Sequence, residues 1–234
     1  MIRLVDVRVD VPVPAPTGGR WTSKTLLQDV RCELPERRIA FIGANGSGKS
    51  TLLRLLNGLM PVTGGRVEVD GLDPATNGKA VRAHVGFVFT DPLSQLLMPT
   101  PIEDVELSLR RVVPQREQRR ARALELLAER GLDRVAEQSI YDLSGGERQL
   151  VALTAVLAVN PGILVADEPT TLLDLGNRLR LRALLDALPQ QVVVSTHDLD
   201  LAASADRVLV VAGGRIVADG SPQESIAFYE ASQR

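Results

Sequence analysis

The feature that most constrains the fold of this chain is the segment Gly43-Ala44-Asn45-Gly46-Ser47-Gly48-Lys49-Ser50. It follows a short apolar run at 39–42, which predicts a buried strand, and precedes leucines that recur at helical spacing from 52 to 59. Glycines at these positions let consecutive backbone N–H groups face an anion at the start of a helix, while Lys49 adds a positive charge and Ser50 a hydroxyl suited to Mg²⁺. A glycine-rich turn without a ligand is the competing interpretation. The strand and helix on either side favour a phosphate-binding loop inside an α/β fold.

Composition limits the remaining classes of protein. The 234 residues, 44% of them hydrophobic, are enough for one domain with a sizeable core. The net charge of −2 gives no basic field that would indicate a nucleic-acid partner. The longest mainly apolar run, 150–159, is well short of the ~20 residues that cross a bilayer. A single cysteine, Cys32, excludes an internal disulfide, and with no apolar block at the start of the chain we expect a reducing cytoplasm.

Strands and helices alternate along most of the chain. Predicted strands lie at 2–9, 26–34, 39–42, 66–69, 85–89, 163–166, 192–195, 208–211 and 215–218, with a long hairpin loop at Pro12–Gly19. Predicted helices follow the phosphate-binding loop, Gly146, Asn177, His197 and Ser221. Such alternation predicts a parallel sheet covered on both faces. A helical tract at 92–145, with one helix starting at Thr100, interrupts it and predicts an inserted subdomain between 1–91 and 146–234.

Two acids end the predicted strand at 163–166. A strand followed by a solvated turn would explain Asp167 and Glu168 equally well if they stood alone. Ligands of open α/β sheets, however, bind at the carboxyl ends of the strands. Beside a phosphate-binding loop, Asp167 can therefore hold Mg²⁺ while Glu168 polarises an attacking water.

The segment Leu143-Ser144-Gly145-Gly146-Glu147 has two compatible interpretations. Ser144 and Glu147 form the S-x-x-E pattern that caps a helix start. The two glycines between them leave bare N–H groups, and the Ser144 hydroxyl is a further donor for a phosphate. The segment therefore predicts a helix start that can also contact a nucleotide.

Taken together, Gly43–Thr51, Leu143–Glu147, Val165–Pro169 and Ser195–Asp198 resemble the ATPase subunit of ABC transporters. The resemblance implies a P-loop NTPase (RecA-like) core with an antiparallel β subdomain and an inserted helical subdomain. It also implies ATP and Mg²⁺ as cofactors. By this resemblance the catalytic residues are Lys49, Glu168 and His197; the ATP-binding residues are Gly43, Asn45, Gly46, Ser47, Gly48, Lys49, Ser50, Thr51, Ser144, Gly145 and Gly146; and the Mg²⁺ ligands are Ser50 and Asp167.

The resemblance also implies partners. In the family, the segment that corresponds to Leu143–Glu147 closes on ATP held by the opposite subunit. Leu173 and Asp174 lie in the loop that crosses that interface. The resemblance therefore implies an ATP-dependent dimer of identical or related chains. The segments Phe89–Thr100 and Ala166–Asp174 resemble energy-coupling-factor (ECF) vitamin importers, most closely the biotin type. This implies a transmembrane coupling subunit, a substrate-binding membrane protein and a place on the cytoplasmic face of the membrane.

Three features depart from the family pattern or leave alternatives open. Thr90 stands where most ABC ATPases have a glutamine that touches Mg²⁺ and water, and Gln95 is a conceivable substitute. The aromatic residue that stacks on adenine in the family is expected at 9–13, so Trp21 either serves or packs on the hairpin. The arginines at 110, 111, 116, 119, 120 and 122 form a solvated helix face or contact lipid head groups or a membrane subunit.

Two other functions compete with a transport ATPase. One is a soluble nucleotide-switched ABC protein that acts on nucleic acid or the ribosome, although the tandem copies or long coiled coil of such proteins are not in this sequence. The other is a nucleotide-binding module that barely hydrolyses ATP, because of Thr90.

Overall fold

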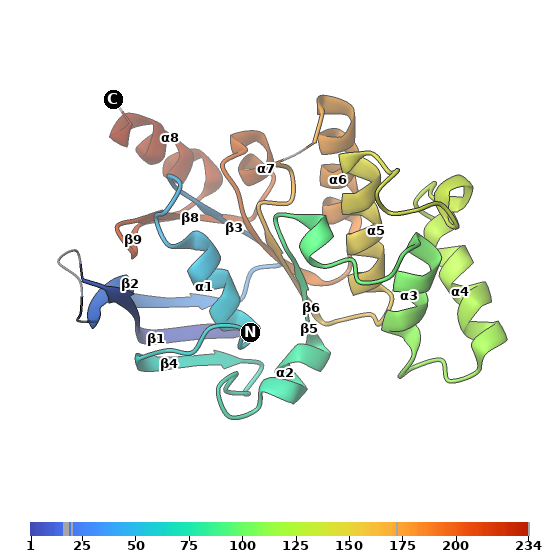
Figure 1. Ribbon diagram of the computed structural model, residues 1–234. Helices are drawn as coiled ribbons and strands as arrows, with labels where there is room; N and C mark the ends of the chain where they lie inside the picture. Colours follow the sequence, from blue (N-terminus) through green and yellow to red (C-terminus); the bar gives the residue numbers. More distant parts are fainter. Residues whose placement is uncertain (16–18, 20, 172, 234) are drawn as a thin grey trace.

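The computed structural model describes residues 1–15, 19, 21–171 and 173–233. A six-stranded sheet with the order β5-β6-β7-β3-β8-β9 runs through the middle of the molecule (Figure 1). Its strands are β3 (Arg38–Ile42), β5 (Val85–Val88), β6 (Ile163–Asp167), β7 (Gln191–Ser195), β8 (Arg207–Ala212) and β9 (Arg215–Gly220). All neighbouring pairs are parallel except β8–β9. The predicted parallel α/β sheet is confirmed.

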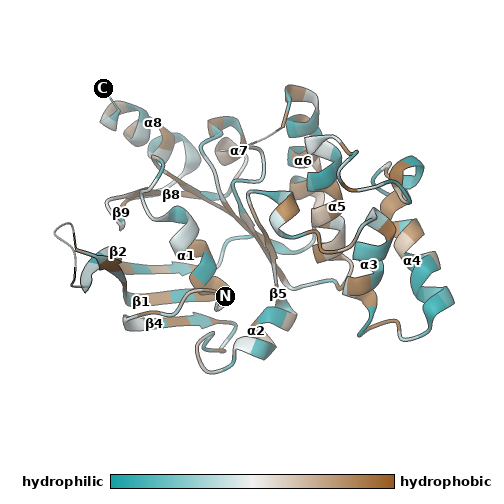
Figure 2. Cartoon of the chain, in the orientation of Figure 1, coloured by the Kyte–Doolittle hydropathy of each residue, from teal (hydrophilic) through white to brown (hydrophobic). Residues whose placement is uncertain are grey.

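Both faces of the five parallel strands are buried, which explains why these strands are almost wholly apolar, whereas the antiparallel edge strand β9 has no buried residue. Along β6, Ile163 and Val165 belong to one hydrophobic core and Leu164 and Ala166 to the other. The two cores lie on opposite faces because successive side chains of a strand point in opposite directions. Figure 2 shows this as a continuous apolar band along the central strands.

A second, antiparallel sheet with the order β2-β1-β4 covers one side of the first. It consists of β1 (Ile2–Pro14), β2 (Trp21–Leu34) and β4 (Gly64–Val69), and helix α1 (Lys49–Leu56) packs between the two sheets. The predicted hairpin loop Pro12–Gly19 began too early, because β1 continues to Pro14, and the predicted strand 26–34 began too late, because β2 starts at Trp21. Beyond Arg8, β1 pairs only with β2, and proline is tolerated on a strand with one free edge. Residues 16–18 of that loop lie outside the described residues.

Helices cover the other face and one edge of the large sheet. Helices α6 (Leu175–Ala187), α7 (Leu199–Ala203) and α8 (Pro222–Ser232) contribute to the second core. Helix α2 (Gly78–His84) precedes β5 and was not predicted, because Val81 is its single buried apolar residue and one residue gives no periodicity. Within the described ranges, none of the helices combines the length and apolar character needed to cross a bilayer.

The remaining helices form a separate cluster on the right of Figure 1. They are η1 (Pro92–Ser94), α3 (Pro101–Leu109), α4 (Arg116–Ala128), η2 (Asp133–Val135) and α5 (Gly145–Leu157). Their core includes Ile102, Leu127 and Val151. Helix α5 joins the two parts, since Val151 packs in this core while Leu153 packs against the large sheet. Thr100 is the N-cap residue of α3, but its hydroxyl donates to the Glu103 carboxylate (2.8 Å) instead of capping a backbone N–H.

Candidate active site

The loop between β3 and α1 curls tightly around its own backbone. Gly43, Gly46 and Gly48 have positive φ angles of 148°, 78° and 115°. A Cβ atom on Gly43 would lie 2.2 Å from the carbonyl oxygen of Val211, and one on Gly48 would lie 2.8 Å from Leu27 Cδ2. Glycine is required at both positions, by conformation and by the lack of space. The curl brings the chain into α1 at Lys49 with its first N–H groups uncapped by any side chain.

The chemistry-bearing side chains come from neighbouring strands. Strands β6, β7 and β3 lie side by side and parallel, so that their carboxyl ends meet at the same edge of the sheet. In this register Asp167 lies opposite Ser195, which lies opposite Phe41 just before the loop. The topology therefore brings residues far apart in the chain to the phosphate-binding loop.

Asp167 and Glu168 are buried and are held by hydrogen bonds from neighbouring elements. Asp167 Oδ1 accepts from Ser50 Oγ (2.8 Å) and from Ser195 Oγ (2.6 Å). The Glu168 N–H donates to the Ser195 carbonyl (3.0 Å) and to Ser195 Oγ (3.1 Å). Glu168 has a left-handed backbone, φ 50°, which is uncommon for a side chain of this size and frequent at functional sites. These contacts fix both acids relative to α1.

Ser195 is the first residue of the segment Ser195–Asp198, which carries part of the resemblance, but the sequence assigned it no role in the site. Its side chain is fully buried, and it contacts both acids. In the sequence it ends an apolar strand, where a serine is unremarkable. Only the pairing of β6 with β7 gives it a role, and sequence spacing alone carries no signal of that pairing.

Lys49, Glu168 and His197 form one continuous set of contacts. Lys49 Nζ donates to the Gly43 carbonyl (2.8 Å) and lies 3.3 Å from Glu168 Oε1. The other Glu168 oxygen accepts from the His197 N–H (3.1 Å) and lies 2.7 Å from His197 Nδ1. Lys49 and Glu168 are buried, whereas the His197 side chain is 56% exposed. The structure thus brings together the three residues that the resemblance assigned to catalysis.

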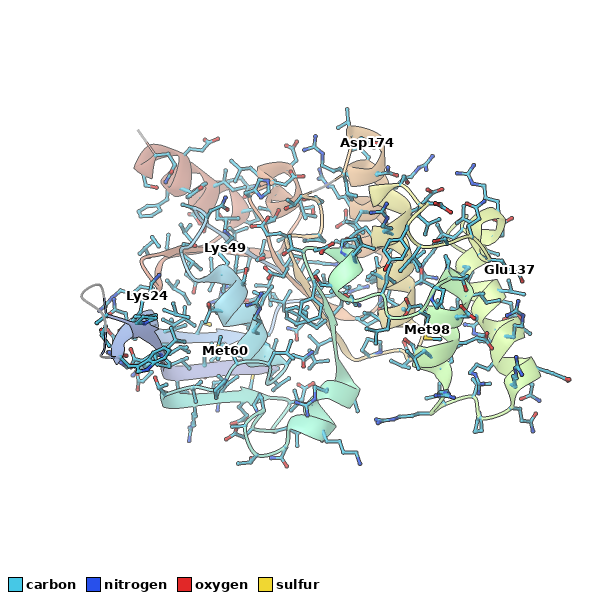
Figure 3. All side chains as sticks on the ribbon, viewed as in Figure 1. Lys24, Lys49, Met60, Met98, Glu137 and Asp174 are labelled. Atoms are coloured by element: carbon cyan, nitrogen blue, oxygen red, sulfur yellow. The ribbon has the colours of Figure 1, made fainter. Side chains whose placement is uncertain are left out.

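A cavity of about 420 Å³ opens above this loop. It is lined by Lys24, Thr25, Leu26, Asn45, Gly46, Ser47, Gly48, Lys49, Ser50, Thr51, Glu168, Gly213 and Gly214. Ser47 Oγ is buried at this loop and has no hydrogen-bond partner in the part of the chain that the structure describes. An unpaired buried hydroxyl beside uncapped helix N–H groups suits an anionic ligand. Figure 3 labels Lys49 at α1 and Lys24 on β2, two residues that line this cavity.

The groups around Ser50 and Asp167 fit a Mg²⁺ ion. Both offer oxygen atoms, and the two oxygens lie 2.8 Å apart. Mg²⁺ prefers oxygen ligands and commonly binds through one or two protein groups, with waters and substrate phosphates completing its shell. The donor set therefore agrees with the predicted role of these two residues.

Ser144, Gly145 and Gly146 lie elsewhere, at the start of α5, and do not line the cavity. Ser144 Oγ accepts from the Glu147 N–H (3.2 Å), and the Ser144 N–H donates to Glu147 Oε2 (2.9 Å), so the predicted capping box is confirmed. The bonds from Ser144 hold the pKa of Glu147 below its usual value. Gly146 packs against α6, where a Cβ would lie 2.4 Å from Asn177 Nδ2.

The loop before α6 is also ordered by a cap. Asp174, labelled at the start of α6 in Figure 3, accepts from the Asn177 N–H (2.8 Å) and, like Leu173, does not line the cavity. Leu172 lies outside the described residues.

The structure also places the positions that depart from the family pattern. Neither Thr90 nor Gln95 lines the cavity, and Gln95 Oε1 accepts from the Phe89 N–H (3.2 Å). Trp21 is 75% exposed at the end of the hairpin and does not line the cavity either. In the arginine cluster, Arg119, Arg120 and Arg122 lie within ion-pair distance of acids of the helical cluster.

Comparison with known proteins identifies the family. A model of the ABC transporter family matches residues 27–171. This chain belongs to that family. It is 42% identical to the biotin transport ATP-binding protein BioM of Rhizobium etli, over 91% of this chain and 94% of the relative. It is 41% identical to the energy-coupling factor transporter ATP-binding protein EcfA1 of Levilactobacillus brevis, over 80% of this chain and 68% of the relative.

Solved structures agree with the family assignment. The fold matches a dimeric, post-hydrolysis structure of the ATP-binding cassette MJ0796 bound to ADP and Pi, with a TM-score of 0.84 and 31% identity, over 95% of this chain and 99% of that one. The P-loop NTPase fold of the ABC type is thereby confirmed. This ABC protein is an ATPase, and ATP is its nucleotide.

Proposed function

We propose that this chain is the Mg²⁺-dependent ATPase subunit of an ECF-type importer, and that the imported solute is a vitamin, with biotin favoured. The observation that carries the catalytic part is the unbroken set of contacts from the phosphate-binding loop through Lys49 and Glu168 to His197. The transport part is supported by the names of the relatives, a biotin transport and an energy-coupling factor ATP-binding protein.

The geometry supports a direct hydrolysis reaction. The loop N–H groups and Lys49 bind the β and γ phosphates. The Glu168 carboxylate accepts a proton from water as the water oxygen bonds to the γ phosphorus, and the bond from that phosphorus to the β–γ bridging oxygen breaks to release ADP. His197, whose Nδ1 lies 2.7 Å from Glu168 Oε2, would contact the γ phosphate. Mg²⁺ at Ser50 and Asp167 would neutralise charge on the phosphates.

The internal partners of Lys49 overlap with the place proposed for the phosphates. Lys49 Nζ is hydrogen-bonded to the Gly43 carbonyl and lies near the Ala44 carbonyl at 3.3 Å. These two oxygens and Glu168 surround the ammonium group where phosphate oxygens would bind. ATP binding therefore exchanges internal partners of Lys49 for phosphate oxygens, at little electrostatic cost because the new partners are more highly charged.

A complete site requires a second chain in this proposal. Ser144–Gly146 do not line the cavity of their own chain, which leaves them to close on ATP held by a partner copy or a related ATPase. Hydrolysis removes the γ phosphate that joins the two chains, and the dimer opens. The motion is delivered to a transmembrane coupling subunit and a substrate-binding membrane protein at the cytoplasmic face of the membrane.

Reconstitution tests this function. The chain is co-expressed with candidate coupling and substrate-binding membrane proteins, and ATP-dependent solute uptake into vesicles is measured. We expect biotin uptake that stops when Glu168→Gln replaces the parent chain. Uptake of riboflavin and not biotin would contradict the solute, and uptake unchanged by Glu168→Gln would contradict the ATPase role.

A further inference from the structure

A second cavity, of about 460 Å³, lies next to the nucleotide cavity. The two cavities share residues 45–47 of the phosphate-binding loop. The lining of the second cavity is otherwise largely apolar and includes Val217 of β9 and Phe228 and Tyr229 of α8. Val217 and Phe228 are exposed, by 44% and 46%. Exposed apolar side chains that gather around one hollow, in contrast to scattered ones, indicate an interaction site.

An exposed aromatic ring stands just before the segment Leu143–Glu147, which was predicted to contact a nucleotide. Tyr141 is 73% exposed. Its N–H donates to Ser139 Oγ (3.3 Å), and its carbonyl accepts from Arg148 Nη2 of α5 (3.1 Å), so the backbone that carries the ring is held at two points. Tyrosine supplies a large and rigid contact area at a low cost in conformational entropy, and it is enriched at protein interfaces. Tyr141 is therefore preorganised to contact another molecule.

The proposed closure of Ser144 on ATP held by a partner fixes the region that this ring can reach. Tyr141 precedes Ser144 by three residues, and three residues span at most about 11 Å. With Ser144 at the phosphates, Tyr141 is close to the partner's phosphate-binding loop, which borders the apolar cavity. Within one chain the ring and the cavity do not meet, because α8 and the start of α5 lie on opposite sides of the molecule (Figure 1) and Tyr141 does not line the cavity.

We propose, as an inference that rests on the proposed function, that Tyr141 inserts into the apolar cavity of a second copy of this chain and packs against its Val217 and Phe228. ATP fills the nucleotide cavity in the closed dimer, which leaves the adjoining apolar cavity for the ring. Two aromatic rings in contact add affinity beyond the area they bury. The contact joins two different surfaces of the same chain, so a two-fold dimer contains it twice.

Site-directed cross-linking tests this contact. Glu168→Gln is the background, because slow hydrolysis keeps the γ phosphate that joins the two chains. In this background Tyr141→Cys and Phe228→Cys are prepared as separate proteins and mixed with a short bismaleimide. We expect a cross-linked dimer of the two variants that forms only when ATP and Mg²⁺ are present. Its absence from preparations that do dimerise with ATP overturns the inference.

Three controls make the cross-link specific. The native Cys32 is buried, and burial raises the pKa of its thiol to about 12, so it carries no reactive thiolate. Leu124→Cys, on the exposed side of α4, is the matched control and should not cross-link to Phe228→Cys. Lys24→Cys reports the nucleotide cavity. Cross-linking of Tyr141→Cys to Lys24→Cys and not to Phe228→Cys would place the ring in the nucleotide cavity and overturn the inference.

Removal of the ring should weaken the dimer and leave the chain itself intact. Loss of a buried aromatic contact reduces affinity by about ten-fold or more. Because the dimer contains the contact twice, we expect Tyr141→Ala to raise the dimer dissociation constant by about 100-fold. Sedimentation of the Glu168→Gln chain with ATP and Mg²⁺ measures this constant. Tyr141→Phe keeps the ring and should retain most of the affinity, and the thermal stability of each variant without ATP should match that of its parent because the side chain is exposed.

The outcomes separate this contact from the proposed dimer. If Tyr141→Ala leaves the dissociation constant of the ATP-dependent dimer unchanged, the contact is overturned while the closure of Ser144 on ATP stands. If Glu168→Gln binds labelled ATP but stays monomeric, the proposed closure is contradicted, and the contact with it. Weaker dimers of Tyr141→Ala together with the cross-link between Tyr141→Cys and Phe228→Cys support the inference.

Discussion

Two helices of this chain begin at glycine-rich segments predicted to contact a nucleotide. They differ in whether side chains form hydrogen bonds with the backbone N–H groups of the first turn. At the start of α1, Gly48 is the N-cap and no side chain bonds to the free N–H groups. At the start of α5, Ser144 and Glu147 cap the helix reciprocally. Lys49 at the first site is 5% exposed, whereas the Ser144–Glu147 bonds lie at the surface. The first helix start is built for a ligand within its own chain; the second is stable without one.

This difference separates the expected effects of substitutions. Contacts around α1 come from three neighbouring strands and carry the proposed chemistry, so changes there should alter hydrolysis and metal binding. Contacts around α5 are local, so changes there should alter the stability of a helix and its neighbour α6.

The largest effect is expected for Glu168→Gln. The amide keeps the size of the side chain but cannot accept a proton, so hydrolysis should fall by about 10²- to 10⁴-fold. Labelled-ATP binding should persist, because the loop and Lys49 remain. Phosphate release and nucleotide binding are measured on the same preparation, with Glu125→Gln on the surface of α4 as the matched control. Loss of both activities in Glu168→Gln would mean that Glu168 organises the loop and is not the base.

Lys49→Ala should weaken nucleotide binding itself. The variant removes a charge-assisted contact to the phosphates, for which a loss of about 10- to 100-fold in affinity is expected. It also leaves Glu168 without its cationic partner at 3.3 Å. Titration with labelled ATP measures the change. Unaltered affinity would place the phosphates away from α1 and remove the basis of the comparison.

Ser195→Ala should weaken Mg²⁺ binding more than it lowers the stability of the fold. Ser195 Oγ donates to Asp167 and accepts from the Glu168 N–H, so it is a positioning residue for both acids. Loss of such support to a metal ligand lowers metal affinity by about 10- to 100-fold, and we expect a comparable rise in the Mg²⁺ concentration at half-maximal hydrolysis. Ser195→Thr, which keeps the hydroxyl, should restore it. A variant with reduced thermal stability but an unchanged Mg²⁺ titration would show a purely structural role.

On the α5 side, Gly146→Ala should cost stability. The new Cβ would lie 2.4 Å from Asn177 Nδ2, and moving that side chain breaks its bond to Asp174 Oδ2. We expect the free energy of unfolding to fall by about 1–3 kcal/mol, the usual cost of overpacking. Chemical denaturation measures the change. In the double variant Gly146→Ala with Asn177→Ala, part of the lost stability should be recovered. If the stability losses of the two single variants were strictly additive, the proposed contact would be contradicted.

Features with a local signal could be predicted from the sequence, whereas features that depend on contacts between distant segments could not. The phosphate-binding loop and the strands around it were predictable because glycine spacing and buried apolar runs are local signals. The role of Ser195 was missed because it depends on the pairing of β6 with β7, and α2 was missed because Val81 is its single buried residue. The extension of β1 through Pro12 to Pro14 was hidden by the prolines, which normally indicate a loop but here occupy a stretch that pairs on one side only.

The smallest effect is a pH dependence confined to the start of α5. Hydrogen bonds from Ser144 lower the pKa of Glu147 below its ordinary value of 4.5. A lowered carboxyl pKa contributes stability that is complete above the unfolded value and is lost as the pH falls through the folded value. Ser144→Ala should therefore lower the free energy of unfolding by about 1 kcal/mol at neutral pH. The difference in this free energy between the variant and the parent chain should become smaller below pH ~4.5. Thermal melts between pH 7 and pH 3.5 measure it.

A gap that stays constant across this range would show that the cap does not depend on the ionised Glu147. Helix α1 offers the internal comparison, because it has no acidic residue in its first turn. Glu147→Gln keeps the capping geometry without the charge. When Ser144→Ala is added to the Glu147→Gln variant, the loss of stability should therefore be the same at both ends of the pH range. A pH-dependent gap that persisted in the glutamine background would assign the titration to another group and leave the α5 cap independent of charge.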